Sequence, residues 1–236
     1  MTVFISLGIL ILPMLIVACL KLVPGVFALF FHYASGKYSK RKTDDLSVFF
    51  ILGAETMVAL AFFLINTLIN ILPPNLLTLG NNILTWIIIG ILISLSLSTF
   101  LFYFRKGSGT ELFISRKIAQ CLNLKAKSVK NRSDAFILGL VSGIPEFIFT
   151  IPLYILSTIT LIQSSFSPIS CSCIIIFCAL IVVSPLFITQ IFYRTDHNLA
   201  DIAKLRTKNK TFFRFFISFL YLALAALIIT FRILIP

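Results

Sequence analysis

The chain has 236 residues, of which 59% are hydrophobic and only 12% are charged, whereas a typical soluble domain has about 25% charged residues. A soluble fold of this length would leave much of that apolar surface in water, so the composition excludes an ordinary soluble domain. Lys and Arg number 20 against 8 Asp and Glu, a net charge of +12. These cations lie in short segments between apolar runs, so we expect contact with lipid headgroups and no nucleic-acid binding.

Six apolar runs are each long enough to cross a bilayer as a helix, which takes about 20 residues. The first segment has no Lys or Arg ahead of its apolar run, so we expect a permanent helix and not a cleaved signal peptide. The sequence therefore predicts an all-α, polytopic protein with six transmembrane helices. In chain order the runs cover residues 3–31, 46–72, 83–104, 135–161, 170–193 and 211–235.

The segments between these runs alternate between basic and uncharged. Residues 32–45, 105–134 and 194–214 hold 18 of the 20 Lys and Arg. Residues 73–82 and 162–169 hold none. The positive-inside rule places the basic segments in the cytoplasm and both termini outside, most simply in a prokaryotic cytoplasmic membrane. The basic segments are then expected to face anionic lipid headgroups.

The central basic segment, residues 105–134, divides the chain into two predicted repeats of three helices, residues 1–104 and 135–236. Three spans per half reverse the orientation of the second half, which predicts an inverted-repeat pair of the kind that many transporters use. Within the segment, a capping-box pattern at residues 108–111 precedes apolar residues at roughly helical spacing. They predict a short amphipathic helix that either lies on the inner membrane surface or packs beneath the bundle.

Three ionisable residues, Lys21, Glu55 and Glu146, lie deep within the apolar runs. A helix rise of about 1.5 Å per residue puts each of them roughly 14 to 16 Å from the inner end of its span, near the bilayer midplane. A charge that faces lipid there costs from about 2.5 to more than 10 kcal/mol. These residues are therefore expected to form either a proton-linked or cation-linked site or structural ion pairs that fix helix packing.

The first helix of each half also carries a proline close to a glycine. Proline removes a helix hydrogen bond, and the freed carbonyl is tolerated at membrane depth only where protein or water satisfies it. The first run also needs a break because 29 residues of straight helix would measure roughly 44 Å. Matched breaks in two halves indicate a transport site. The candidate site residues are Lys21, Pro24, Gly25, Glu55, Gly143, Pro145 and Glu146.

This pattern resembles the lysine-exporter (LysE-like) superfamily, which also includes membrane thiol carriers related to CcdA and to the central domain of DsbD. The residues that carry the resemblance are Val23-Pro24-Gly25, Ile144-Pro145-Glu146 and the basic segment in mid-chain. The resemblance implies an exporter of amino acids or cations with proton or cation coupling. The chain lacks the second proline usual after Pro24-Gly25, and Glu146 is not a typical residue at its place.

The thiol-carrier branch needs a reactive cysteine in the first helix of each half. Cys19 can serve in the first half, but residues 134–161 contain no cysteine, so thiol transfer is disfavoured. His32 and His197 lack metal-type spacing, and no P-loop, nucleophile elbow or zinc-protease motif is present. We therefore expect neither an enzyme nor a cofactor. The alternative to a transporter is a non-transporting membrane subunit or scaffold of a larger complex; a homo-oligomer is compatible with either.

Overall fold

A computed structural model of the full chain describes residues 2–20, 23–71, 74–102, 116–163, 167–194 and 210–230. Within these ranges the regular structure is helical throughout, which confirms the predicted all-α class. The elements are α1 (Thr2–Leu20), α2 (Val23–Lys37), α3 (Lys40–Ile71), α4 (Pro74–Phe102), α5 (Arg116–Ser128), α6 (Arg132–Ser142), the short 3₁₀ helix η1 (Ile144–Glu146), α7 (Phe147–Gln163), α8 (Pro168–Arg194) and α10 (Lys210–Ile229).

Two of these helices have stretches long and apolar enough to cross a membrane, Lys40–Ile71 and Ile169–Ile191. Shorter apolar stretches occur in α1, α4, α7 and α10. Large apolar side chains are also exposed along α3, where Leu52, Leu60, Leu64 and Leu68 form one ridge, and along α4, α8 and α10. Exposed apolar surface of this extent is rare in soluble monomers and suits a lipid environment.

The helices extend beyond the apolar runs that predict them. Helix α2 continues to Lys37 and α3 begins at Lys40, so the predicted loop at residues 32–45 shrinks to two residues. Helix α4 begins at Pro74, although its apolar run begins at residue 83. Hydropathy marks only the part of a helix that suits lipid, and the same backbone hydrogen bonding continues into polar residues at each end.

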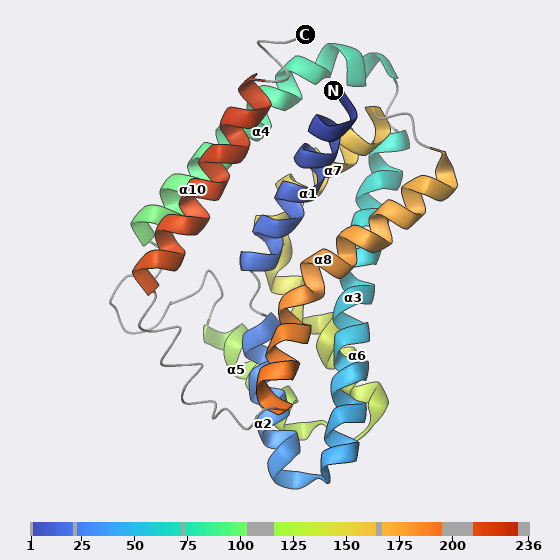
Figure 1. The fold of residues 1–236 in the computed structure, drawn as a ribbon, viewed down its shortest axis with the longest axis vertical. Coiled ribbons are helices and arrows are strands. Elements are labelled where there is room, and N and C mark those ends of the chain that lie inside the picture. Colours follow the sequence, from blue (N-terminus) through green and yellow to red (C-terminus); the bar gives the residue numbers. More distant parts are fainter. Residues whose placement is uncertain are drawn as a thin grey trace.

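Figure 1 shows how the two interrupted spans are arranged along the longest axis of the molecule. Helices α1 and α7 lie in the upper half of the view, and α2 and α6 lie in the lower half. Helix α1 packs against α7, and α2 contacts α6, so each half of one interrupted span lies beside a half of the other. Helices α4 and α10 form a separate pair at one side of the bundle (Figure 1).

Helices α3 and α6 make the most extensive helix contact, because two glycines let their backbones approach closely. A Cβ atom on Gly53 would lie 2.1 Å from the carbonyl oxygen of Phe136, and one on Gly139 would lie 2.1 Å from that of Phe50. Small residues at such crossings are typical of helices that associate within a membrane. Gly53 and Gly139 therefore set the distance between these two helices.

Helices α4 and α10 are joined by a reciprocal serine contact. The hydroxyls of Ser96 and Ser218 are buried, and their oxygens lie 2.9 Å apart. Each hydroxyl also reaches the backbone carbonyl of the other residue, at 3.0 and 3.1 Å. Hydrogen bonds between serines are a known means of joining helices in lipid, and this one holds the peripheral pair together.

The predicted helix in the basic central segment corresponds to α5. Its buried residues Leu122 and Ala126 lie on the side that packs against α2. The sequence left open whether this helix lies on the inner membrane surface or packs beneath the bundle. This geometry agrees with packing against the bundle. The capping-box pattern at residues 108–111 lies outside the described residues.

A candidate transport site at two helix interruptions

The interruption in the second half is a single 3₁₀ turn between α6 and α7. Gly143 has helical dihedrals (φ −81°, ψ −21°), and its N–H bonds to the carbonyl of Leu140, three residues back, at 3.4 Å. Pro145 follows and has no N–H to give to the carbonyl of Val141, four residues earlier. The predicted break is therefore a local tightening of the helix and not a fully unwound segment.

In the first half, α1 is described to Leu20 and α2 from Val23, and residues 21 and 22 between them lie outside the described residues. Pro24 is the second residue of α2. Proline is well tolerated in the first turn of a helix, because the N–H it lacks has no partner within the helix there. The sequence predicts a break at Pro24; Pro24 itself lies in the first turn of α2, and a break just before it stays a prediction.

A contact between α1 and α7 puts Leu20 of α1 at the level of the 3₁₀ turn that precedes α7. The hydroxyl of Ser157 donates to the carbonyl of Leu10 at 3.5 Å. Leu20, the last residue of α1, comes ten residues after Leu10, and Phe147, the first residue of α7, comes ten residues before Ser157. Helices α1 and α7 run in opposite directions (Figure 1), and with about 1.5 Å of rise per residue Leu20 and Phe147 both lie roughly 15 Å from this contact on the same side of it.

Glu55 lies on α3 close to the same level. Met57, two residues further on, has its Cγ 3.1 Å from the position of a Cβ on Gly143. On the other side, the Phe50 ring packs against Phe27 of α2 at 5.2 Å between ring centres. Helices α2 and α3 are antiparallel neighbours, so Gly25 lies within about one helix turn of Glu55 along the axis. Glu55 itself is half-buried.

The predicted site residues thus divide into those that the structure places and those it does not. The backbones of Pro24 and Gly25 lie in the first turn of α2, those of Gly143, Pro145 and Glu146 lie at the 3₁₀ turn, and Glu55 lies close to the same level on α3. Lys21 lies outside the described residues, as do the side chains of Pro24 and Glu146. Whether Lys21 and the two carboxylates meet therefore stays a prediction.

Sequence reasoning missed the hydroxyl groups on α7. Ser157, Thr158 and Thr160 are all buried, within a stretch of this helix that is enclosed on every side by protein. The Thr158 hydroxyl has no hydrogen-bond partner among the described residues. In a helix this apolar, serines and threonines show no helical periodicity that would mark a buried face. Their burial follows from the central position of α7 in the bundle.

Comparison of the chain with models of protein families, with curated proteins and with solved structures finds no match in any of the three.

Proposed function

We propose that this chain is a multi-pass membrane protein that transports a small solute. Its six proposed spans are α1 with α2, α3, α4, α6 with α7, α8, and α10, arranged as two inverted repeats of three. By its resemblance to the LysE-like superfamily, the solute is an amino acid or a cation, which the protein exports with proton or cation coupling.

The observation that carries this proposal is the side-by-side placement of the first and fourth predicted spans. Helix α1 packs on α7 and α2 contacts α6, and the Ser157–Leu10 contact puts Leu20, next to the predicted first break, at the level of the 3₁₀ turn before α7. Interrupted helices at corresponding positions of two halves typically hold the substrate site of a transporter. A pair of merely kinked structural helices has no need for this alignment.

The chemistry of the proposed site follows from its residue types. Pro145 has no N–H for the Val141 carbonyl, which is instead reached by the N–H of Gly143 within the tightened turn. A carbonyl oxygen has a second lone pair, which a cation or water could take here. Glu55 and Glu146 would take up the coupling proton or cation, and Lys21 would hold a substrate carboxylate or act as a counter-ion. Substrate binding at the middle of the molecule's longest axis leaves half a helix on each side of the site to act as a gate.

Flux through liposomes that contain the purified full chain tests the proposal. We expect wild-type protein to move L-lysine together with a pH change reported by a trapped dye. Glu146→Gln and Lys21→Ala should abolish most of this flux. Glu111→Gln, which makes the same chemical change in the basic central segment, should preserve it.

Wild-type flux in both site variants would reject these residues as the site. Folded wild-type protein that moves neither L-lysine nor Rb⁺ but co-purifies with stoichiometric partners would instead favour a scaffold subunit.

A further inference from the structure

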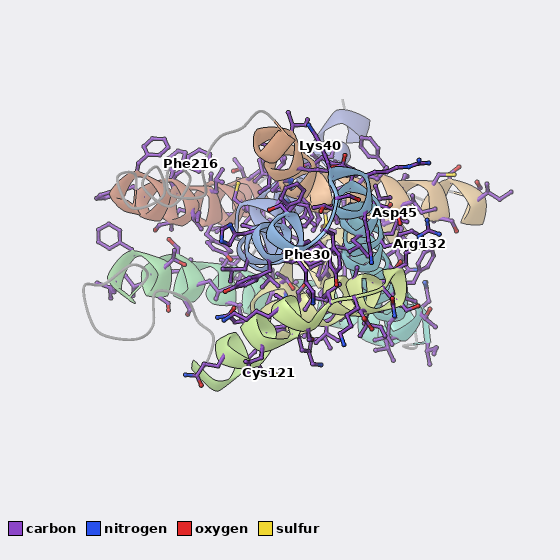
Figure 2. The ribbon with its side chains drawn as sticks, turned by 90° about the horizontal axis from the view of Figure 1, so that it is seen from below. Phe30, Lys40, Asp45, Cys121, Arg132 and Phe216 are labelled. Atoms are coloured by element: carbon purple, nitrogen blue, oxygen red, sulfur yellow. The ribbon has the colours of Figure 1, made fainter. Side chains whose placement is uncertain are left out.

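Two basic segments that are far apart in the sequence meet at one end of the molecule. Residues 37–45 and 125–134 together contain eight Lys and Arg and three Asp. The Tyr38 hydroxyl donates to the carbonyl of Val129 at 3.1 Å and ties α2 to the chain after α5. Figure 2 views this end and shows Asp45 and Arg132 facing each other. We call it the basic end; its exposed cations are Lys37, Lys40, Arg41, Lys42, Lys125, Lys127, Lys130 and Arg132.

The carboxylates of the basic end do not balance these cations. Asp45 is bound by Arg132 through two hydrogen bonds of 2.7 and 3.1 Å. Asp134 accepts the backbone N–H groups of Lys130 and Asn131, at 3.1 and 3.2 Å, at the start of α6. These two acids are therefore engaged in an ion pair and a helix cap. The excess positive charge points to an anionic partner.

Three lysines are held over tyrosine rings in this region. Lys127, from α5, lies 5.1 Å from the ring centre of Tyr33 on α2. Lys42 and Lys37 lie 4.1 and 5.4 Å from the ring centre of Tyr38. A cation over a ring face is fixed in position but keeps N–H donors that point away from the ring. Such lysines are arranged in advance to bind an anion.

Apolar side chains are exposed directly beside these lysines. Leu29, Tyr33 and Lys37 are spaced four residues apart on α2 and so share one face of the helix. That face changes over two helix turns from apolar, through aromatic, to cationic. On α5, Leu124 is 68% exposed and lies one turn from Lys127. This order of side chains matches the acyl chain, interface and headgroup of a bilayer.

We propose that the face formed by Leu29, Tyr33 and Lys37 of α2 with Leu124 and Lys127 of α5 binds one anionic phospholipid. The two lysines contact the headgroup phosphate, Tyr33 lies at the interface, and the leucines contact the first part of an acyl chain. A soluble anion would need the lysines but would leave the adjoining exposed leucines without a role. The inference rests on the proposed membrane position of the helices and does not require transport.

The test measures thermal unfolding of the full chain in a non-ionic detergent during titration with phosphatidylglycerol or phosphatidylcholine. Phosphatidylglycerol should raise the unfolding midpoint, and phosphatidylcholine should not. Each lysine near an anionic headgroup contributes about fivefold in affinity, so Lys37→Gln with Lys127→Gln should weaken the phosphatidylglycerol effect roughly 25-fold. Replacement of both lysines by arginine should preserve it, and a cooperative unfolding transition of the Gln variant without added lipid shows that this variant folds.

Lys40→Gln with Lys130→Gln is the matched control, since both lysines are exposed at the basic end and are not among those held over a tyrosine ring. This variant should lose much less affinity. Equal losses in the two double variants would overturn the site in favour of diffuse attraction. An equal effect of inorganic phosphate would overturn the lipid in favour of a soluble anion. Flux measured in phosphatidylcholine liposomes tests the transport proposal separately.

Discussion

The contact between α3 and α6 yields a sharp prediction for Gly139→Ala. The new Cβ would lie 2.1 Å from the carbonyl oxygen of Phe50 and 3.0 Å from the backbone nitrogen of Ala54. Ordinary contacts of a Cβ begin near 3.4 Å, so the backbones must separate by about 1.3 Å, the difference of the two distances. Both neighbours are backbone atoms and cannot rotate away. The substitution is therefore expected to cost free energy by loosening the packing of α3 against α6 as a whole.

Two opposing effects set the size of the change. Alanine is a better helix former than glycine by about 1 kcal/mol. Overpacking of a well-packed contact costs about 1 to 3 kcal/mol and sometimes more, and this contact is at the severe end. We expect the free energy of unfolding to fall by about 2 kcal/mol, which corresponds to roughly 4 to 8 °C in the midpoint for a chain of this size.

Gly90→Ala is the control, because a Cβ on Gly90 of α4 meets no atom within 4 Å. Its thermal midpoint in detergent should be unchanged or slightly raised. If Gly139→Ala unfolds at the same temperature as Gly90→Ala, the close approach of α3 and α6 is wrong. Gly53→Ala gives an independent repeat from the other helix, because its Cβ meets the carbonyl oxygen of Phe136.

Three further substitutions test the remaining contacts by the same thermal assay. Ser218→Ala removes a partner of the buried Ser96 and should cost about 1 kcal/mol; an unchanged midpoint would contradict the serine pairing of α4 with α10. Thr158→Val removes a buried hydroxyl that has no partner among the described residues and should leave the midpoint equal or higher, whereas a marked fall would mean that this hydroxyl has a ligand. Asp45 raises the pKa of Arg132, mainly by its hydrogen bond, but the guanidinium is fully exposed. Asp45→Asn should therefore leave the midpoint in 0.15 M salt unchanged, and a clear loss would indicate a larger structural role for this pair.

Composition and the rise per residue predict local structure, because both depend only on the residues of a single helix. The apolar runs locate α3 and α8. Excess length predicts a break in the first run near Pro24; Pro24 itself lies in the first turn of α2, and residues 21 and 22 before it lie outside the described residues. Helix α2 continues past its apolar run as far as Lys37, and α3 begins at Lys40, ahead of its own run, so polar residues extend both helices beyond the apolar runs.

The contacts between helices follow from tertiary packing, which the sequence of one segment does not contain. Gly53 and Gly139 are separated by 86 positions, and neither carries a sign that the other is its partner. The same holds for Ser157 and Leu10, whose contact sets the level of Leu20 relative to the 3₁₀ turn before α7. By contrast, the depths assigned to Glu55 and Glu146 need only the helix rise.

Access of water to the interruptions is the most direct measurement of the central idea. In a chain whose five native cysteines are replaced by alanine, Gly143→Cys and Leu64→Cys are each exposed in liposomes to a membrane-impermeant thiol reagent. Leu64 is exposed on the lipid-facing ridge of α3 and should stay unlabelled. We predict that Gly143→Cys is labelled, because the interrupted spans meet in a wet site. Absence of labelling at both positions would mean that the interruptions are dry kinks and that no solute passes between them.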